Sequence, residues 1–177
     1  MSTLADTRSL TIEHVIIASN QSYETVLEGL ERRLGSAEGT RESQQRLQAL
    51  AAAQASWEQV SEVIERHLGT SDFQLFTTVE QTALLTLAGK TSRAVQYTVG
   101  NPLLAIQMIR LMPEIALPEV ALYAPLRFVV YQDETGKTFV AYDHFVSLLA
   151  QYQCEEITQV AQIVEQKLEA LLTAVTQ

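Results

Sequence analysis

The stretch VQYTVGNPLLAIQMIRLMPEIALPEVALYAPLRFVVYQDETGKTFVAYD, residues 95–143, decides the fold of this chain. It opens as an apolar strand that ends at Gly100-Asn101-Pro102, and Pro102 suits the first turn of a helix, where its missing N–H costs nothing. Two apolar segments, residues 126–132 and 137–142, then flank an acidic turn that closes with Gly136, which is typical of a β-hairpin. The stretch therefore predicts a strand, a helix and a hairpin in succession.

This order of motifs resembles the domain-of-unknown-function 302 family, whose members are small α/β proteins with a Gly-Asn-Pro turn and a later hairpin. The resemblance runs from about Ile12, resumes over residues 56–152, and is carried by Tyr97, Gly100, Asn101, Pro102, Pro125, Arg127, Tyr131, Gly136, Lys137 and Tyr142. It implies an α+β fold: two layers, with a mostly antiparallel, curved sheet of about five strands and helices on one face. Many members carry an Asp-His pair where this chain reads TVEQ, residues 78–81, so a role that needs that histidine is not expected here.

The segments before the decisive stretch alternate between strand and helix patterns. Residues 10–18 are apolar on both faces, which predicts a central strand. Ser22 is a good helix N-cap, and the helix pattern that follows it runs to Gly35. A strand is predicted for residues 73–78, a helix for residues 79–88 with a stop at Gly89, and a strand for residues 93–99; a last short helix, residues 144–152, would be capped by Asp143.

A duplicated segment lies inside the first half of the chain. SYETVLEGLERRLG, residues 22–35, recurs as SWEQVSEVIERHLG, residues 56–69, with eight of the fourteen positions identical. Two copies are too few for a solenoid, so we interpret residues 36–55 as a helical insertion within a single domain, residues 1–177. Two arrangements are consistent with this pattern: a local helical hairpin, or one long helix over residues 40–68 that acts as an oligomerisation arm.

The C-terminal extension, residues 153–177, contains a helix with a narrow apolar seam. Its seam residues are spaced three and four apart, as in a coiled coil: Ile157, Val160, Val164, Leu168, Leu171 and Val175. Such a seam needs a partner helix. The partner is either a second copy of the chain, which predicts a homo-oligomer and most simply a dimer, or another element of the same chain.

Composition limits the partners and the setting. The chain has a net charge of −9 and a pI near 4.8, which argues against nucleic acid as a partner because phosphate binding draws on clustered Lys and Arg. No apolar run is long enough to span a bilayer. The single cysteine, Cys154, allows no internal disulfide, and no secretory signal is evident at Met1, so a cytoplasmic location is expected.

A ligand site is predicted where the Gly-Asn-Pro turn faces the hairpin. Arg127 begins an otherwise apolar strand, so its charge should be paired, either with a small anionic ligand or with a carboxylate of the protein. Asn101 would hold the helix start near the ligand, or merely cap the helix, and Tyr131 and Tyr142 would flank the site or pack in the core.

Reactive groups give no support for a known chemistry. His14, His67 and His144 are far apart in sequence, so no metal site is expected, and no catalytic residue or cofactor is indicated. The sequence favours a non-catalytic small-ligand-binding or protein-interaction module that acts as a homo-oligomer. The alternative is an enzyme of unrecognised type with a pocket at the Gly-Asn-Pro turn and Arg127.

Overall fold

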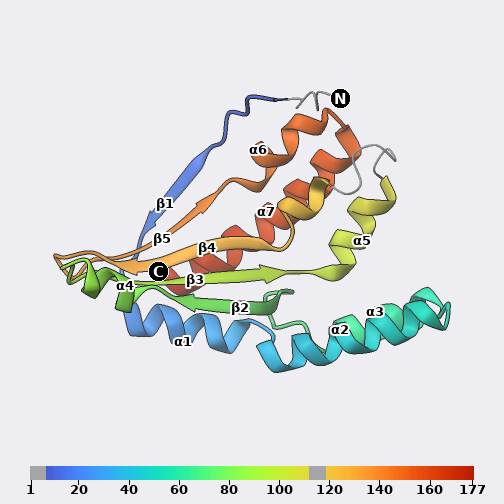
Figure 1. Ribbon diagram of the computed structural model, residues 1–177, viewed down its shortest axis with the longest axis horizontal. Coiled ribbons are helices and arrows are strands. Elements are labelled where there is room, and N and C mark those ends of the chain that lie inside the picture. The colour runs from blue at the N-terminus through green and yellow to red at the C-terminus, as the bar shows by residue number, and fades with distance from the viewer. Residues whose placement is uncertain (1–6, 112–118) are drawn as a thin grey trace, which may run out of the picture.

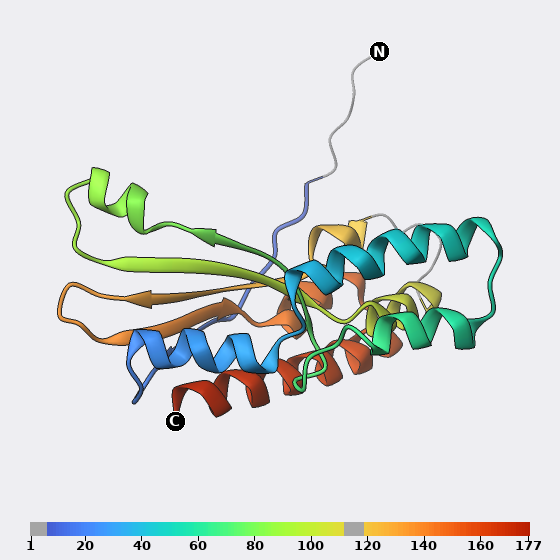
Figure 2. The same ribbon diagram turned by 90° about the horizontal axis from the view of Figure 1, so that it is seen from below.

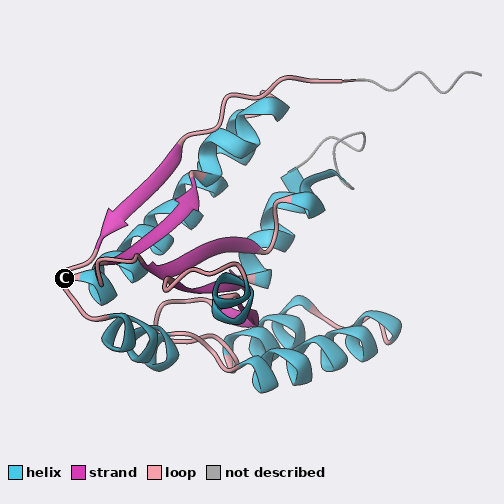
Figure 3. Ribbon diagram, turned by 60° about the vertical axis from the view of Figure 1, so that its left-hand side comes forward, coloured by secondary structure: helices cyan, strands magenta, loops and turns pink. Residues whose placement is uncertain are grey.

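The computed structural model describes residues 7–111 and 119–177, which form one curved sheet and several helices (Figure 1). The strands are β1 (His14–Ala18), β2 (Gln74–Glu80), β3 (Arg93–Gly100), β4 (Leu126–Gln132) and β5 (Thr138–Asp143). Their order in the sheet is β1-β5-β4-β3-β2, and every neighbouring pair is antiparallel. The predicted α+β fold with a five-stranded antiparallel sheet is confirmed, and Figure 3 shows the curvature.

The hairpin of β4 and β5 has the predicted turn chemistry. Asp133 Oδ1 accepts hydrogen bonds from the N–H groups of Thr135 and Lys137 at 2.9 and 3.0 Å. Gly136 adopts a φ of 83°, the left-handed conformation that glycine enters without steric strain. Local sequence therefore specifies the turn of this hairpin.

The first strand lies at the edge of the sheet, so the prediction of a central strand was wrong. Among the strands of the described residues, β1 pairs only with β5, in the register His14 to Asp143 through Ala18 to Phe139. Val15 and Ile17 point towards the core, whereas Ile16 points away from it and is 57% exposed. Both faces of β1 are apolar because the sheet face opposite the core also carries apolar side chains, and a central position is not needed to explain the pattern.

Two helices cover one face of the sheet (Figure 2). They are α1 (Tyr23–Arg33) and α7 (Glu155–Thr176), and the short α6 (Phe145–Leu149) packs on α7. Ser22 is the N-cap of α1, as predicted, and its hydroxyl accepts a hydrogen bond from the N–H of Thr25 at 3.2 Å. The core lies between these helices and the strands.

The seam of α7 is part of that core. All six predicted interface residues are at most 6% exposed: Ile157, Val160, Val164, Leu168, Leu171 and Val175. The helix packs against α1, α5 and α6 of the same chain, so the intramolecular alternative describes this seam. In this structure these side chains contact the core of their own chain.

The insertion and the second copy of the repeat form a helical hairpin and not one long helix. α2 (Ala37–Ala52) is separated by a turn from α3 (Trp57–Glu65), and Ser56 begins α3 with a capping box that Gln59 completes. The hairpin packs on β2, where Gln74 is fully buried and its amide donates to Ser43 Oγ and to the carbonyl of Ile64.

The two copies of the repeat end side by side. The N–H groups of Gly35 and Gly69 donate to the same carbonyl, that of Phe73, at 2.9 and 3.0 Å. A Cβ on Gly35 would lie 2.0 Å from the carbonyl oxygen of His67, and one on Gly69 would lie 2.0 Å from that of Arg33. Glycine is therefore required at both positions by the close approach of the two backbones.

The remaining helices differ from the sequence prediction at their starts. α4 (Thr82–Leu87) begins later than predicted because Val79 and Glu80 extend β2 and pair with β3. Gly89 ends it with a φ of 76°, as expected. α5 (Pro102–Leu111) follows the Gly-Asn-Pro turn, and the two 3₁₀ turns are η1 (Glu119–Leu122) and η2 (Ala150–Tyr152). The expected end of the helix after the Gly-Asn-Pro turn, at Met112 before Pro113, lies outside the described residues, and so does Pro118.

The start of α6 was also predicted incorrectly. Its N-cap is His144, and the carboxylate of Asp143 instead binds His14 Nδ1 at 2.8 Å. The first N–H of α6, that of Phe145, donates to Glu165 Oε2 on α7. A carboxylate distant in sequence thus replaces the local cap.

Within the described residues, no helix combines the length and the apolar character that crossing a membrane requires.

Candidate functional site

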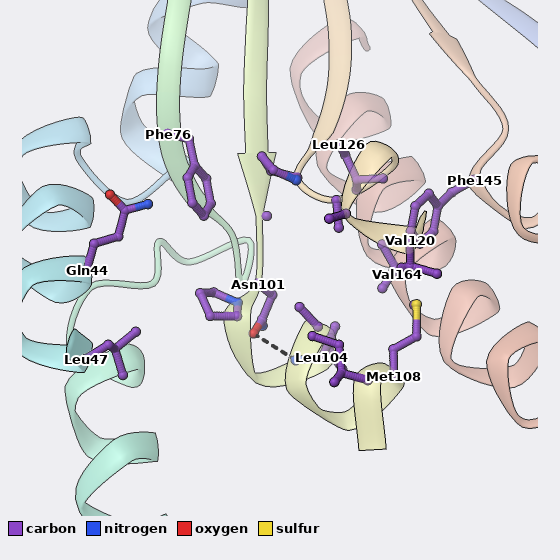
Figure 4. Close-up of a pocket in the computed structure, with 17 residues that line it drawn as sticks. Gln44, Leu47, Phe76, Asn101, Leu104, Met108, Val120, Leu126, Phe145 and Val164 are labelled. Carbon is purple, nitrogen blue, oxygen red and sulfur yellow. Dashed lines mark hydrogen bonds between the residues drawn. The ribbon is translucent and has the colours of Figure 1, made fainter. Parts of the chain in front are cut away.

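An apolar pocket of about 360 Å³ lies at the end of the sheet where β3 turns into α5 (Figure 4). Its wall is assembled from distant parts of the chain: α2 of the hairpin, β2, the Gly-Asn-Pro turn, α5, η1, α6 and α7. Side chains that line it include Leu47, Phe76, Leu104, Met108, Val120, Leu126, Phe145 and Val164. The pocket is thus lined at one end by strand ends and the start of α5, and on its sides by helices.

The Gly-Asn-Pro turn forms one side of this pocket. Asn101 Oδ1 accepts hydrogen bonds from the N–H groups of Leu103 and Leu104 at 2.9 and 3.4 Å, and its Nδ2 donates to the carbonyl of Asp72 at 2.9 Å. Asn101 is therefore the N-cap of α5. A Cβ on Gly100 would lie 3.2 Å from Pro125 Cβ and 3.3 Å from Phe76 Cε2, so glycine allows these two rings to close on the turn.

The four predicted ligand residues do not form one site. Only Asn101 lines the pocket. Arg127 and Tyr131 alternate with the buried Leu126, Phe128 and Val130 along β4, which directs them to the sheet face opposite the core. Successive side chains of a strand point to opposite faces of the sheet, so closeness in the sequence does not bring these side chains to one site.

Arg127 and Tyr131 lie on the open face of the sheet, and Tyr142 lies in the core. Arg127 is exposed next to Thr98, so solvent hydrates its charge and the expected partner is not required. Tyr131 stacks on Phe139 with ring centroids 5.1 Å apart. Burial, with added repulsion from Glu165 and Glu169, raises the pKa of Tyr142 to about 12, so its hydroxyl stays protonated near neutral pH.

The pocket offers few groups for chemistry. Among the described residues that line it, none is ionisable, and the only polar side chains are Asn101 and Gln44. Both ends of the Asn101 amide are already used within the protein. The amide of Gln44 is thus the polar group that faces the pocket from α2, opposite the α5 wall (Figure 4).

Sequence reasoning missed the hairpin wall of the pocket. Gln44 and Leu47 lie on a helix whose pattern indicates only good helix formers, and nothing local predicts that this helix reaches across to α5. The sequence indicates only weakly that Met108 lines the pocket, because Met108 follows the Gly-Asn-Pro turn on a helix that is apolar on most sides.

Fold and pocket together define a small α+β protein with an apolar cavity at one end of an antiparallel sheet. The chain belongs to the family of the domain of unknown function DUF302, whose model matches residues 49–175. The fold is similar to the crystal structure of an uncharacterized conserved protein DUF302 from Bacillus stearothermophilus, with a TM-score of 0.59 and 18% sequence identity over 92% of this chain and 97% of that one. No curated protein matches the chain.

Proposed function

We propose that this chain is a non-catalytic binding module for a small, largely apolar molecule, which occupies the pocket beside the Gly-Asn-Pro turn. One observation carries the proposal: a cavity of about 360 Å³ with an almost wholly apolar lining. Binding sites for small molecules are typically concave, apolar and larger than about 300 Å³, with a few polar groups that orient the ligand.

The lining favours an uncharged ligand over the anionic one expected from the sequence. The N–H groups at the start of α5 already bind Asn101 Oδ1, and the guanidinium of Arg127 lies on the other face of the sheet. An anion in the pocket would lose its hydration without a compensating partner. Gln44 supplies one amide, which suits a ligand with a single hydroxyl or carbonyl group.

The same lining favours binding over catalysis. General acid–base and nucleophilic mechanisms need a titratable or nucleophilic group within hydrogen-bond reach of the substrate. The described lining residues supply only apolar groups and two amides.

The test is to fill the pocket and measure the binding of an uncharged fluorescent dye such as Nile red. Ala105, on the α5 wall, becomes Phe; the matched control is Ala170→Phe on the exposed surface of α7. The dye should bind the parent and the control with one site, and Ala105→Phe should weaken binding at least tenfold while retaining the circular dichroism of the fold. Equal binding by Ala105→Phe and the parent would contradict the proposal.

A second pair of variants tests the orienting amide. Gln44→Leu should reduce the affinity for a dye or lipid alcohol with a hydroxyl group, and Gln45→Leu, one position away on α2 and outside the lining, should not. If Gln44→Leu binds a hydroxylated ligand as well as the parent does, Gln44 has no orienting role.

We also propose that the chain forms a homodimer through the open face of its sheet. Half-buried Val129, Tyr131 and Phe139 lie on this face beside Ile16, and α4 carries Leu84 and Leu87, which are 63% and 85% exposed. Apolar side chains gathered on one exposed face are typical of an interface, and a two-fold dimer would cover this face with an identical one.

Sedimentation of the parent and of two charge variants tests the dimer. Ile16→Arg adds a charge to the open face, and Ile163→Arg adds the same charge at a position on α7 that is 40% exposed. The parent and Ile163→Arg should sediment as dimers at micromolar concentration, and Ile16→Arg as a monomer. A monomeric parent, or a dimeric Ile16→Arg, would refute an interface on this face.

A further inference from the structure

A second cluster of polar side chains lies outside the pocket, where α6 begins. His144 joins β5 to α6, and Glu165 and Glu169 lie one turn apart on α7. One ligand atom from each residue, a ring nitrogen or a carboxylate oxygen, lies within 4.8 Å of the other two. His144 is about a quarter exposed and Glu169 is exposed, so a solvated ion can reach the cluster.

Glu165 is the unusual member of the cluster because it is buried. The residue is only 4% exposed, and its Oε2 accepts the hydrogen bond from the N–H of Phe145. Its other oxygen, Oε1, has no hydrogen-bond partner among the described residues. A buried carboxylate oxygen without a partner is costly, which points to a missing positive group at this place.

His144 alone is a poor partner for that oxygen. Its Nε2 lies 3.8 Å from Glu165 Oε1, which is too long for a hydrogen bond. Two ligands that each lie about 2.1 Å from a shared zinc ion are separated by roughly 3.4 Å at a tetrahedral angle and by about 4.2 Å at most. The observed separation of 3.8 Å falls between these two values, so one zinc ion can bind both residues. The exposed side chain of Glu169 can supply the third ligand.

We propose that His144, Glu165 and Glu169 bind a divalent cation of the zinc type. One imidazole and two carboxylates match the ligand sets of zinc and its neighbours in the first transition row, with water in the remaining position. The ion would supply the positive charge that Glu165 Oε1 lacks, and it would tie α7 to the junction of β5 and α6. This site does not depend on the ligand pocket, although the adjacent Phe145 and Val164 line that pocket.

The experiment is a calorimetric titration of chelator-treated, full-length protein with Zn²⁺ alone. We expect saturable binding of one equivalent, a rise in the melting temperature with zinc, and visible absorption when Co²⁺ replaces it. Changes one shell beyond a metal typically cost about 10- to 100-fold in affinity, so loss of a direct ligand should cost at least tenfold. Glu169→Gln is the decisive variant, because this exposed side chain can change without disturbing the core.

The control is a second histidine–carboxylate pair. His14 Nδ1 lies 2.8 Å from Asp143 Oδ1 on the surface, and this pair is not part of the three-residue cluster. His14→Gln should bind zinc as the parent does. His144→Gln and Glu165→Gln should bind zinc more weakly than the parent, as Glu169→Gln should. The proposal is overturned if the parent binds no zinc at millimolar concentration, or if Glu169→Gln binds it as tightly as the parent.

Discussion

Asn101 and Arg127 illustrate how differently two motif residues are used. Both polar atoms of the Asn101 side chain form hydrogen bonds within the protein. Its Oδ1 caps α5, and its Nδ2 donates to the carbonyl of Asp72. Arg127 lies exposed on β4, and its charge is hydrated. Of the two, Asn101 is therefore the residue that shapes the pocket, because the position of α5 depends on it.

Replacement of Arg127 should have little effect on stability or on binding in the pocket. Arg127→Met keeps the stem of the side chain and removes an exposed charge, and surface changes of this kind usually alter the free energy of unfolding by less than about 0.5 kcal/mol. Urea denaturation and dye titration of the variant test this expectation. A tenfold loss of dye affinity would mean that Arg127 reaches the ligand after all.

Glu165 should make the stability of the protein depend on pH. Burial raises the pKa of its carboxyl above the ordinary value of 4.5, against the opposing effects of the Phe145 N–H and of His144. The folded protein then holds this proton more tightly than the unfolded chain. The contribution of Glu165 is most favourable below pH 4.5, and it declines as the pH rises through the pKa of the folded state.

Glu165→Gln isolates this effect, because its side chain stays neutral at every pH. We expect the stability of the parent relative to the variant to fall as the pH rises from the ordinary carboxyl pKa of 4.5 through the raised pKa of the folded state, in the presence of a chelator. The charged or titratable groups around the carboxyl are His144, Glu169 and Tyr142, and all three remain in the variant. A stability difference that stays constant across this range would show that burial does not raise this pKa.

Among the elements, α7 decides how the chain is held together. Its apolar stripe faces the sheet and α1, so a cavity there should weaken the fold directly. Leu168→Ala should lower the free energy of unfolding by about 2–5 kcal/mol, the usual cost of this truncation in a core. Denaturation curves at several protein concentrations measure it: the loss should be the same at each one, whereas a loss that depends on concentration would place Leu168 between chains.

Elements with strong local signals could be predicted from the sequence, and the family resemblance implied the antiparallel five-stranded sheet, but the place of β1 in the strand order could not be predicted. The hairpin at Asp133–Gly136, the cap at Ser22 and the helix after Pro102 follow from turn and capping chemistry within a few residues. The edge position of β1 depends on its pairing with β5, more than a hundred residues later. A local pattern of apolar residues does not contain that information.

The same distinction applies to the candidate sites. The Gly-Asn-Pro turn was recognised because its three residues are consecutive, but Gln44 reaches the pocket from a helix that precedes the turn by many residues. The sequence does not associate His144 with Glu165, because His144 precedes α6 and Glu165 lies on α7. Only the packing of α6 on α7 brings the two side chains together. Sites assembled by tertiary packing require the structure.

At the scale of the whole molecule, the α2–α3 hairpin is an excursion from the core. The chain leaves at Gly35 and returns at Gly69, where both backbone N–H groups bind the carbonyl of Phe73. Replacement of residues 36–68 by a short Gly-Ser linker should therefore preserve the sheet and the α7 core. Because Gln44 and Leu47 would be lost from the pocket wall, dye binding should fall at least tenfold.

Circular dichroism, a cooperative urea transition and dye titration distinguish the outcomes for this deletion. A folded variant that no longer binds dye would show that the hairpin is not needed for folding and that it completes the pocket. An unfolded variant would mean that the burial of Gln74 by the hairpin is needed for folding.

The meeting of Gly35 and Gly69 has an evolutionary consequence. A segment whose two ends touch adds little closure entropy when it grows or shrinks, since that cost rises only with the logarithm of its length. Insertions at such a point leave the strands and their register undisturbed. One wall of the pocket is thus formed by a hairpin that can change in length and sequence while the sheet stays the same, so the shape of the pocket can vary independently of the strands.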